Sequence, residues 1–211
     1  MKKVRLEIDF IEIKRKRRKW NLYMIIATDD PSGDSKTMIT TVPGEAIKLR
    51  KMDGNRVDFE SEGHGQTNGL IVLEQKMPSS HSLRVRIWLV QSRKNTRKAG
   101  EVLEELGSNM KKKDMEVVFM EAAKALGSVN PWIEISRNLI MMSGMVGTFL
   151  RNSDDRHLGF FNLDEHFTEE EIELGELDRF GKITSVGEAG WTWVIEDSTV
   201  SKKYLAEGKM Q

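Results

Sequence analysis

Residues 2–19 read KKVRLEIDFIEIKRKRRK, an alternating apolar segment that leads directly into six consecutive basic residues. Every second position is apolar, as in a β-strand with one buried face, at Val4, Leu6, Ile8 and Phe10. Ile11 and Ile13 continue the alternation in the opposite phase. Because one extra residue exchanges the two faces of a strand, we expect a β-bulge near Phe10 and Ile11. The segment therefore predicts a half-buried strand that ends in a dense cationic tip.

Similar alternation recurs through the first ninety or so residues, where short apolar segments are separated by turn residues. Its clearest example is residues 82–90, in which the apolar positions Leu83, Val85, Ile87 and Leu89 alternate with Arg84, Arg86 and Trp88. We expect further strands at residues 20–27, 38–42, 46–49, 57–59 and 70–73. Short strands separated by turns predict an antiparallel β-sheet or β-sandwich over residues 1–91.

The hydrophobic period changes from two to 3.6 at about residue 95, which indicates helices. Apolar stripes at residues 99–106 and 115–126 each stop before a glycine, the residue that commonly follows a helix. Asn130 and Pro131 are typical of a helix start, and the apolar residues from Trp132 to Phe149 would form the buried face of that third helix. We therefore expect three helices between residues 96 and 152, packed on the sheet.

The C-terminal third is expected to contain a short acidic helix and a hairpin. Thr168 and Glu171 have the spacing of a capping box, and we expect the helix that they open to reach Phe180. Residues 182–186 and 191–196, on either side of a glycine-containing turn, predict a β-hairpin. The complete prediction is one α+β domain over residues 1–197, with about seven N-terminal strands, three helices and a C-terminal hairpin. Residues 198–211 would form a flexible tail.

Composition limits the class of protein. The 211 residues are 38% hydrophobic and 31% charged, as in ordinary soluble globular proteins. The absence of cysteine excludes disulfides and thiolate chemistry, and it agrees with a reducing compartment. The N-terminus does not have the pattern of a signal peptide, and the apolar run at residues 139–150 is shorter than the about 20 residues that cross a bilayer. We expect an intracellular protein, cytoplasmic or nuclear, without a transmembrane helix.

Charge is balanced overall but unevenly distributed. The chain has 33 lysines and arginines and 33 aspartates and glutamates, so an electrostatic function depends on local asymmetry. Residues 1–20 and residues 81–113 each contain nine basic and three acidic residues, whereas residues 151–180 contain ten acidic ones. The protein is therefore expected to be polarised, or to neutralise itself across an internal or intersubunit contact.

The basic run is the main candidate for binding an anion. Adjacent cations repel one another unless an anion lies across them, and neutralised phosphates release counterions, which makes such binding salt-dependent. The alternative is a solvated hairpin tip without a ligand. The candidate residues are Lys14, Arg15, Lys16, Arg17, Arg18 and Lys19.

A second basic group is expected on the outer face of the 82–90 strand and just after it. An exposed Trp88 between arginines would suit stacking with nucleic acid bases, but Trp88 could instead be covered by a following helix. The candidate residues are Arg84, Arg86, Arg93 and Lys98.

These features predict a non-enzymatic binding or assembly protein. Its basic residues would contact nucleic acid or an anionic membrane, and its acidic segment at residues 151–180 would contact another copy or another protein. No cofactor or metal is predicted. The enzymatic alternative would combine His157 or His166 with a neighbouring carboxylate, but no catalytic motif accompanies either histidine.

Two resemblances support a peripheral membrane or assembly function. Acidic loops at residues 29–34 and 154–155 resemble the calcium-binding loops of a C2 domain, which would imply calcium-dependent membrane binding. Residues 180–183 and 190–197 resemble the last hairpin of rhabdovirus matrix proteins, which would imply a viral assembly protein. The chain lacks the long basic arm and the proline motif that those matrix proteins usually carry.

Overall fold

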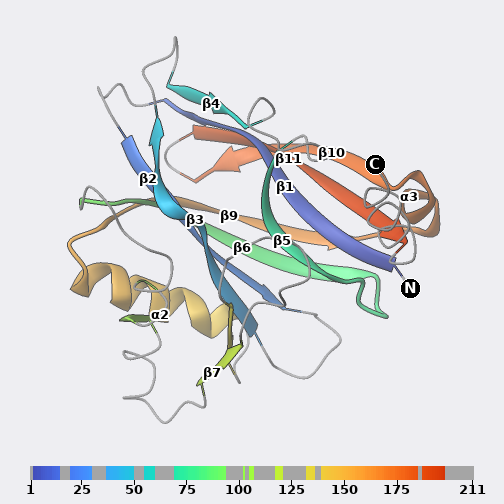
Figure 1. Cartoon of the computed structure of the whole chain (residues 1–211), viewed down its shortest axis with the longest axis horizontal. Helices are drawn as coiled ribbons and strands as arrows, with labels where there is room; N and C mark the ends of the chain where they lie inside the picture. Colours follow the sequence, from blue (N-terminus) through green and yellow to red (C-terminus); the bar gives the residue numbers. More distant parts are fainter. Residues whose placement is uncertain are drawn as a thin grey trace, which may run out of the picture.

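The computed structural model describes residues 2–14, 20–29, 37–49, 55–59, 69–93, 102, 105–106, 117–120, 132–135, 139–184 and 187–197. They form two antiparallel β-sheets and two helices, as Figure 1 shows. Sheet A contains β1 (Lys2–Ile13), β4 (Arg56–Asp58), β5 (Leu70–Lys76), β10 (Glu176–Ile183) and β11 (Gly187–Asp197). Sheet B contains β2 (Trp20–Asp29), β3 (Thr37–Leu49), β6 (Ser82–Gln91), β7 (Val117–Met120), β8 (Trp132–Ile135) and β9 (Arg156–His166). The helices are α2 (Leu139–Asn152) and α3 (Glu169–Leu174).

Both sheets are antiparallel, which confirms the antiparallel β-structure of the predicted α+β fold, but the described residues contain more strand and less helix than that prediction had. The strand order in sheet A is β10-β11-β1, and the other edge of β1 pairs with β5 along its first half and with β4 near its end. The order in sheet B is β7-β8-β3-β2-β6-β9. Strands from both ends of the chain thus meet in sheet A, where β1 lies against β11.

The predicted bulge in β1 is present, but it lies earlier than expected. Pairing with β11 shifts register between Ile8 and Phe10, and Ile11 and Ile13 follow the bulge into the core with no exposed surface. Phe10 is only partly buried and contacts Phe180. The prediction that Phe10 shares the inner face of β1 was therefore wrong, because the extra residue comes before it and turns it outward.

The main core lies between the two sheets. β1, β2, β6, β9 and β11 each contribute buried apolar residues to it. Aromatic contacts join the sheets: the rings of Phe161 and Trp191 lie 5.9 Å apart, and those of Phe167 and Trp193 meet edge-on at 5.3 Å. Such pairs stabilise a core beyond the area that they bury.

A second core lies on the opposite face of sheet B, beneath α2. Tyr23, Ile25 and Trp88 pack there with Val146 and Phe149 of the helix. Trp88 is only 3% exposed, so it does not form a surface for stacking with bases. The alternative in which a helix covers Trp88 is confirmed.

The prediction of three helices at residues 96–152 was wrong. Residues 117–120 and 132–135 form the paired strands β7 and β8, and the helix expected from Pro131 begins at Leu139. Residues 117–120 read VVFM, a β-branched and aromatic sequence that favours a strand. Short apolar segments fit either period, so the expected helical stripe was ambiguous there. Residues 102, 105 and 106 are helical, as expected for the first of the three.

The strand count also differs. Residues 38–42 and 46–49 belong to the single strand β3, whose register shifts opposite Leu22 and Met24 instead of breaking at the proline and glycine. Six strands, β1–β6, therefore lie in the described part of residues 1–91, instead of about seven. β9 was not predicted at all.

The C-terminal elements agree more closely with the sequence. Thr168 and Glu171 form the predicted capping box, but α3 ends at Gly175, whose φ of 78° is the left-handed conformation that closes a helix. β10 begins at Glu176, so the expected extension of the helix to Phe180 was wrong. The predicted hairpin is present as β10 and β11, but its turn comes earlier than expected: Ile183 lies opposite Gly187, and residues 187–190, expected between the two strands, belong to β11. The expected tail at residues 198–211 lies outside the described residues. Among the described helices, none has the length and apolar character needed to cross a membrane.

Candidate anion-binding site

Four basic residues gather at one end of the sandwich because of the way its strands alternate in direction. β1 ends at Ile13, and β6 ends beside the start of β2, where the amide of Ser92 donates to the carbonyl of Asn21 at 2.8 Å. β9 starts at the same end, since Arg156 pairs with Gln91. Arg151 is in the last turn of α2, five residues before Arg156 at the start of β9. We call this end of the molecule, on the left in Figure 1, the basic end, after its exposed side chains Lys14, Arg93, Arg151 and Arg156.

The basic run attaches to this end. Lys14 follows β1, and Trp20 begins β2. The remaining candidates of the run lie outside the described residues: Arg15, Lys16, Arg17, Arg18 and Lys19. The run therefore connects β1 of sheet A to β2 of sheet B, at the end of the molecule where the exposed basic side chains of both sheets lie.

Lys14 is partly compensated by a carboxylate. Its ammonium group forms an exposed ion pair with Glu188 of β11. The hydrogen bond to Glu188 raises the pKa of Lys14 above its usual value. Exposed pairs of this kind contribute little to stability, so an anionic ligand can compete for the lysine at small cost.

Asp155, directly before β9, connects β2 with the residue that follows β6 at the basic end. Its buried carboxylate accepts a hydrogen bond from the Tyr23 hydroxyl at 2.8 Å and another from the Arg93 backbone amide at 3.2 Å. These bonds fix the backbone at Arg93 while its side chain points to solvent. Asp155 therefore supports the site instead of competing with a ligand.

The second predicted basic group is divided: Arg84 and Arg86 lie away from the basic end, whereas Arg93 belongs to it. Arg84 donates two hydrogen bonds to the buried carboxylate of Asp29, at 3.0 and 3.2 Å, and Arg86 donates to Asn162 at 2.7 Å. Asp29 lies seven residues along β2 from Leu22, so Arg84 is about 24 Å from the basic end. Arg93 belongs to the basic end, and Lys98 lies outside the described residues.

The same strand directions do not support the resemblance to the calcium-binding loops of a C2 domain. Asp29 and Asp155, one from each of the two acidic segments, lie at opposite ends of sheet B. Asp30 and Asp34 lie outside the described residues. In the part of the chain that the structure describes, no three histidine or acidic side chains are grouped so that they could hold a metal ion.

The histidines occupy separate environments. His166 Nδ1 lies 2.8 Å from the Ser82 hydroxyl, and His81 Nδ1 lies 3.5 Å from Glu169 at an exposed position. His157 stacks on Phe160 with ring centroids 6.3 Å apart, while the neighbouring Asp155 turns toward Tyr23. His64 lies outside the described residues. The described histidines thus do not assemble the arrangement that the enzymatic alternative requires.

His157 makes folding sensitive to acid. The His157 side chain is largely exposed, but partial desolvation of its ring, which stacks on Phe160, lowers its pKa below the usual value near 6.5, so the unfolded chain binds the proton more readily than the folded chain does. The stabilising contribution is complete above about pH 6.5 and is lost as the pH falls toward the lower, folded-state pKa. We expect His157→Gln to reduce the loss of stability between pH 7 and about pH 5, measured by urea unfolding at each pH. His166→Gln, near the exposed end of the same strand, is the control, and an equal effect there would contradict the assignment.

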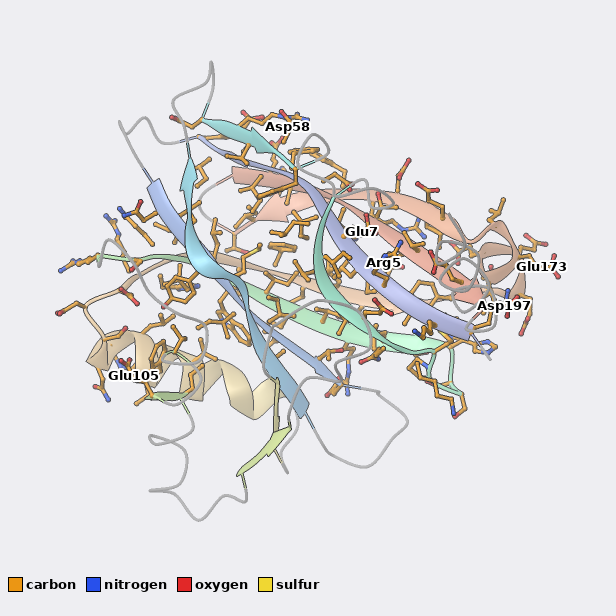
Figure 2. The ribbon with its side chains drawn as sticks, viewed as in Figure 1. Arg5, Glu7, Asp58, Glu105, Glu173 and Asp197 are labelled. Carbon is orange, nitrogen blue, oxygen red and sulfur yellow. The ribbon has the colours of Figure 1, made fainter. Side chains whose placement is uncertain are left out.

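The end opposite the basic end is acidic. Residues 164–178 contain no lysine or arginine but include Asp164, Glu165, Glu169, Glu170, Glu171, Glu173, Glu176 and Asp178. Figure 2 shows Glu173 and Asp197 near α3, away from Asp58 on β4. Hydrogen bonding from the Thr168 backbone, followed by the interaction with Arg179, lowers the pKa of Glu171. The described surface thus carries more carboxylates than basic side chains at this end, where Lys2, Lys76 and Arg179 also lie, and exposed basic side chains at the other.

One group of side chains was missed by sequence reasoning. Phe10, Phe180 and Arg56 meet on the outer face of sheet A. Phe10 was expected in the core, and Phe180 at the end of a helix. Only the position of the bulge and the early end of α3 bring the two rings together, and neither was evident from the hydrophobic pattern.

No protein family model matches the chain, and no match was found among curated proteins or solved structures. The similarity of the β10–β11 hairpin to rhabdovirus matrix proteins remains a prediction that concerns this hairpin alone. The function is therefore argued from the geometry and charge of the molecule.

Proposed function

We propose that this chain is a non-enzymatic binding protein that contacts an anionic polymer or surface through its basic end. The observation that carries the proposal is that Lys14 and the start of β2 lie at the same end of the molecule as Arg93 and Arg156. In the sequence, the five further cations of the run connect these two positions. Charges from distant parts of the chain add their fields when they lie at one end of a compact domain.

The acidic end supports the same proposal by giving the molecule a direction. An anionic partner is attracted to the basic end and repelled by the carboxylates around α3, so it encounters the protein in one orientation. Nucleic acid and an anionic membrane both fit this description, and nucleic acid is the first candidate because its phosphates are closely and regularly spaced.

The test is a salt titration of binding by the wild-type chain. Fluorescence anisotropy would follow the binding of labelled single- and double-stranded DNA between about 50 and 200 mM salt. Over this range, the affinity of a protein that makes six to ten phosphate contacts falls by about 10³- to 10⁵-fold. Sedimentation with vesicles of anionic and of neutral lipid would test the membrane. Binding to none of these ligands, or binding that is insensitive to salt, would overturn the proposal.

A second candidate function is self-association. The basic end of one copy and the acidic end of the next are complementary, and a head-to-tail contact of this kind produces a ring or an open filament instead of a closed dimer. Light scattering would then show a mass that rises with protein concentration and falls with salt. A single concentration-independent mass at low salt would contradict this candidate.

A further inference from the structure

The outer face of sheet A carries an exposed pair of aromatic rings. Phe180 of β10 and Phe10 of β1 both pair with Gly190 on the strand between them. Because Gly190 has no side chain, the Phe10 ring lies over its backbone: a Cβ at this glycine would be 2.4 Å from Phe10 Cε1. The two ring centroids are 6.1 Å apart, and Phe180 remains 61% exposed.

An arginine extends this surface. The guanidinium carbon of Arg56 lies 3.7 Å from the centroid of the Phe10 ring, and its Nε donates to Asp58 at 2.7 Å. The contact with Phe10 and the bond to Asp58 hold the flat guanidinium group in place. We call Phe10, Phe180 and Arg56 the aromatic patch. It consists of planar groups on strands, which require little further ordering when a ligand binds.

The surroundings of the patch contain both signs of charge. One pair further along the strands, Lys182, Glu188, Glu12 and Arg56 form a cross-strand row, and Lys14 lies just beyond it. In the other direction the Thr192 hydroxyl lies 3.0 Å from a carboxylate oxygen of each of Asp9 and Asp178. Successive rows are about 7 Å apart, so carboxylates flank the rings on both sides.

This pattern favours a flat polar ligand over a bilayer. A membrane that covered Phe180 would also have to desolvate the carboxylates in the neighbouring rows, which is costly. A nucleobase covers only a ring or two, and its amino groups can donate to carboxylates beside it. The faces of a base are accessible in single strands but are covered by neighbouring base pairs in a duplex.

We infer that the aromatic patch stacks bases of a single-stranded nucleic acid whose phosphates continue toward the basic end. Lys14, directly after β1, is four residues from Phe10, about 14 Å along an extended chain, so a short single-stranded nucleic acid can reach both. The inference rests on the proposed function, since the basic residues supply most of the affinity. Phe180, the most exposed member, is the main stacking group, and Arg56 and Phe10 continue the surface.

The test compares Phe180→Ala with Leu174→Ala. Both remove an exposed apolar side chain, but Leu174, 73% exposed, lies on α3 at the acidic end. With a labelled single strand of roughly 12 nucleotides, we expect Phe180→Ala to weaken binding by roughly 5- to 150-fold and Phe180→Trp to retain it. We expect Leu174→Ala to bind as the wild type does, and all three variants to share the wild-type salt slope, because no phosphate contact is lost.

The outcomes separate this inference from the proposed function. Salt-dependent binding by the wild type with unchanged affinity in Phe180→Ala would overturn the stacking inference and leave the basic end as the site. If Phe180→Ala lost binding to anionic vesicles but kept its affinity for oligonucleotides, Phe180 would be a membrane contact, and the stacking inference would be overturned as well. A thermal unfolding curve for each variant checks that the fold is kept, as expected for substitutions at exposed side chains.

Discussion

Glutamine at all six positions of the basic run, residues 14–19, is expected to lower the affinity for nucleic acid by on the order of 10³- to 10⁴-fold at 0.15 M salt. Each cation that neutralises a phosphate releases counterions, and the resulting gain of free energy is lost when the charge is removed. The slope of log affinity against log salt should become shallower by about 5, because each lost contact contributes about 0.9. Fluorescence anisotropy with DNA over a salt series measures both quantities.

The control for this prediction compares two double variants that each remove two positive charges, one from the basic run and one from the opposite end of the molecule. Lys16→Gln with Arg17→Gln removes two charges from the run, and Lys2→Gln with Lys76→Gln removes two at the end of sheet A opposite Lys14. We expect only the first pair to reduce the salt slope, by about 2. Equal losses in the two double variants would show that net charge, and not the basic end, attracts the partner.

Local sequence signals predicted much of this fold. Alternation over residues 82–90 predicts β6 because Leu83, Val85, Ile87 and Leu89, at every second position, all enter the main core. The capping box at Thr168 and Glu171 depends on residues three apart, and the β10–β11 hairpin on residues close in sequence. Such elements are determined by their own residues, so no knowledge of the remaining fold is needed to find them.

Elements that depend on distant partners were predicted less well. Residues 117–120 form a strand because β8 is beside them, and the apolar pattern alone cannot distinguish that pairing from a helix. The face occupied by Phe10 depends on where β11 shifts its register. One residue of difference in the bulge decides whether this ring enters the core or reaches the surface.

The candidate site could be predicted only in part for a similar reason. Lys14 and Arg93 are far apart in the sequence, but strand directions bring them to one end of the sandwich. Arg84 lies close to Arg93 in the sequence but at the far end of β6, where Asp29 neutralises it. The composition of a segment therefore identifies its charge but not which charges act together.

Trp193→Ala is expected to lower the free energy of unfolding by about 3–5 kcal/mol. Trp193 is among the largest fully buried side chains. Its ring packs edge-on against that of Phe167, which lies between β9 and α3. Alanine would leave a large cavity between the sheets at the strand that pairs with both β1 and β10. Urea unfolding followed by circular dichroism measures the loss. An unchanged m-value, the slope of the free energy of unfolding against urea concentration, would show that unfolding exposes as much surface in the variant as in the wild type.

Trp193→Phe separates the volume of this side chain from its polar atom. Within the described part of the chain, the buried indole nitrogen of Trp193 has no hydrogen-bond partner. Phenylalanine removes this donor, which is unfavourable when buried, and keeps an aromatic ring against Phe167. The expected loss is therefore small, below about 1.5 kcal/mol, because the smaller ring gives up some packing but relieves the unpaired donor. A loss as large as that of Trp193→Ala would mean that the indole nitrogen makes a stabilising bond, and the packing explanation would be wrong.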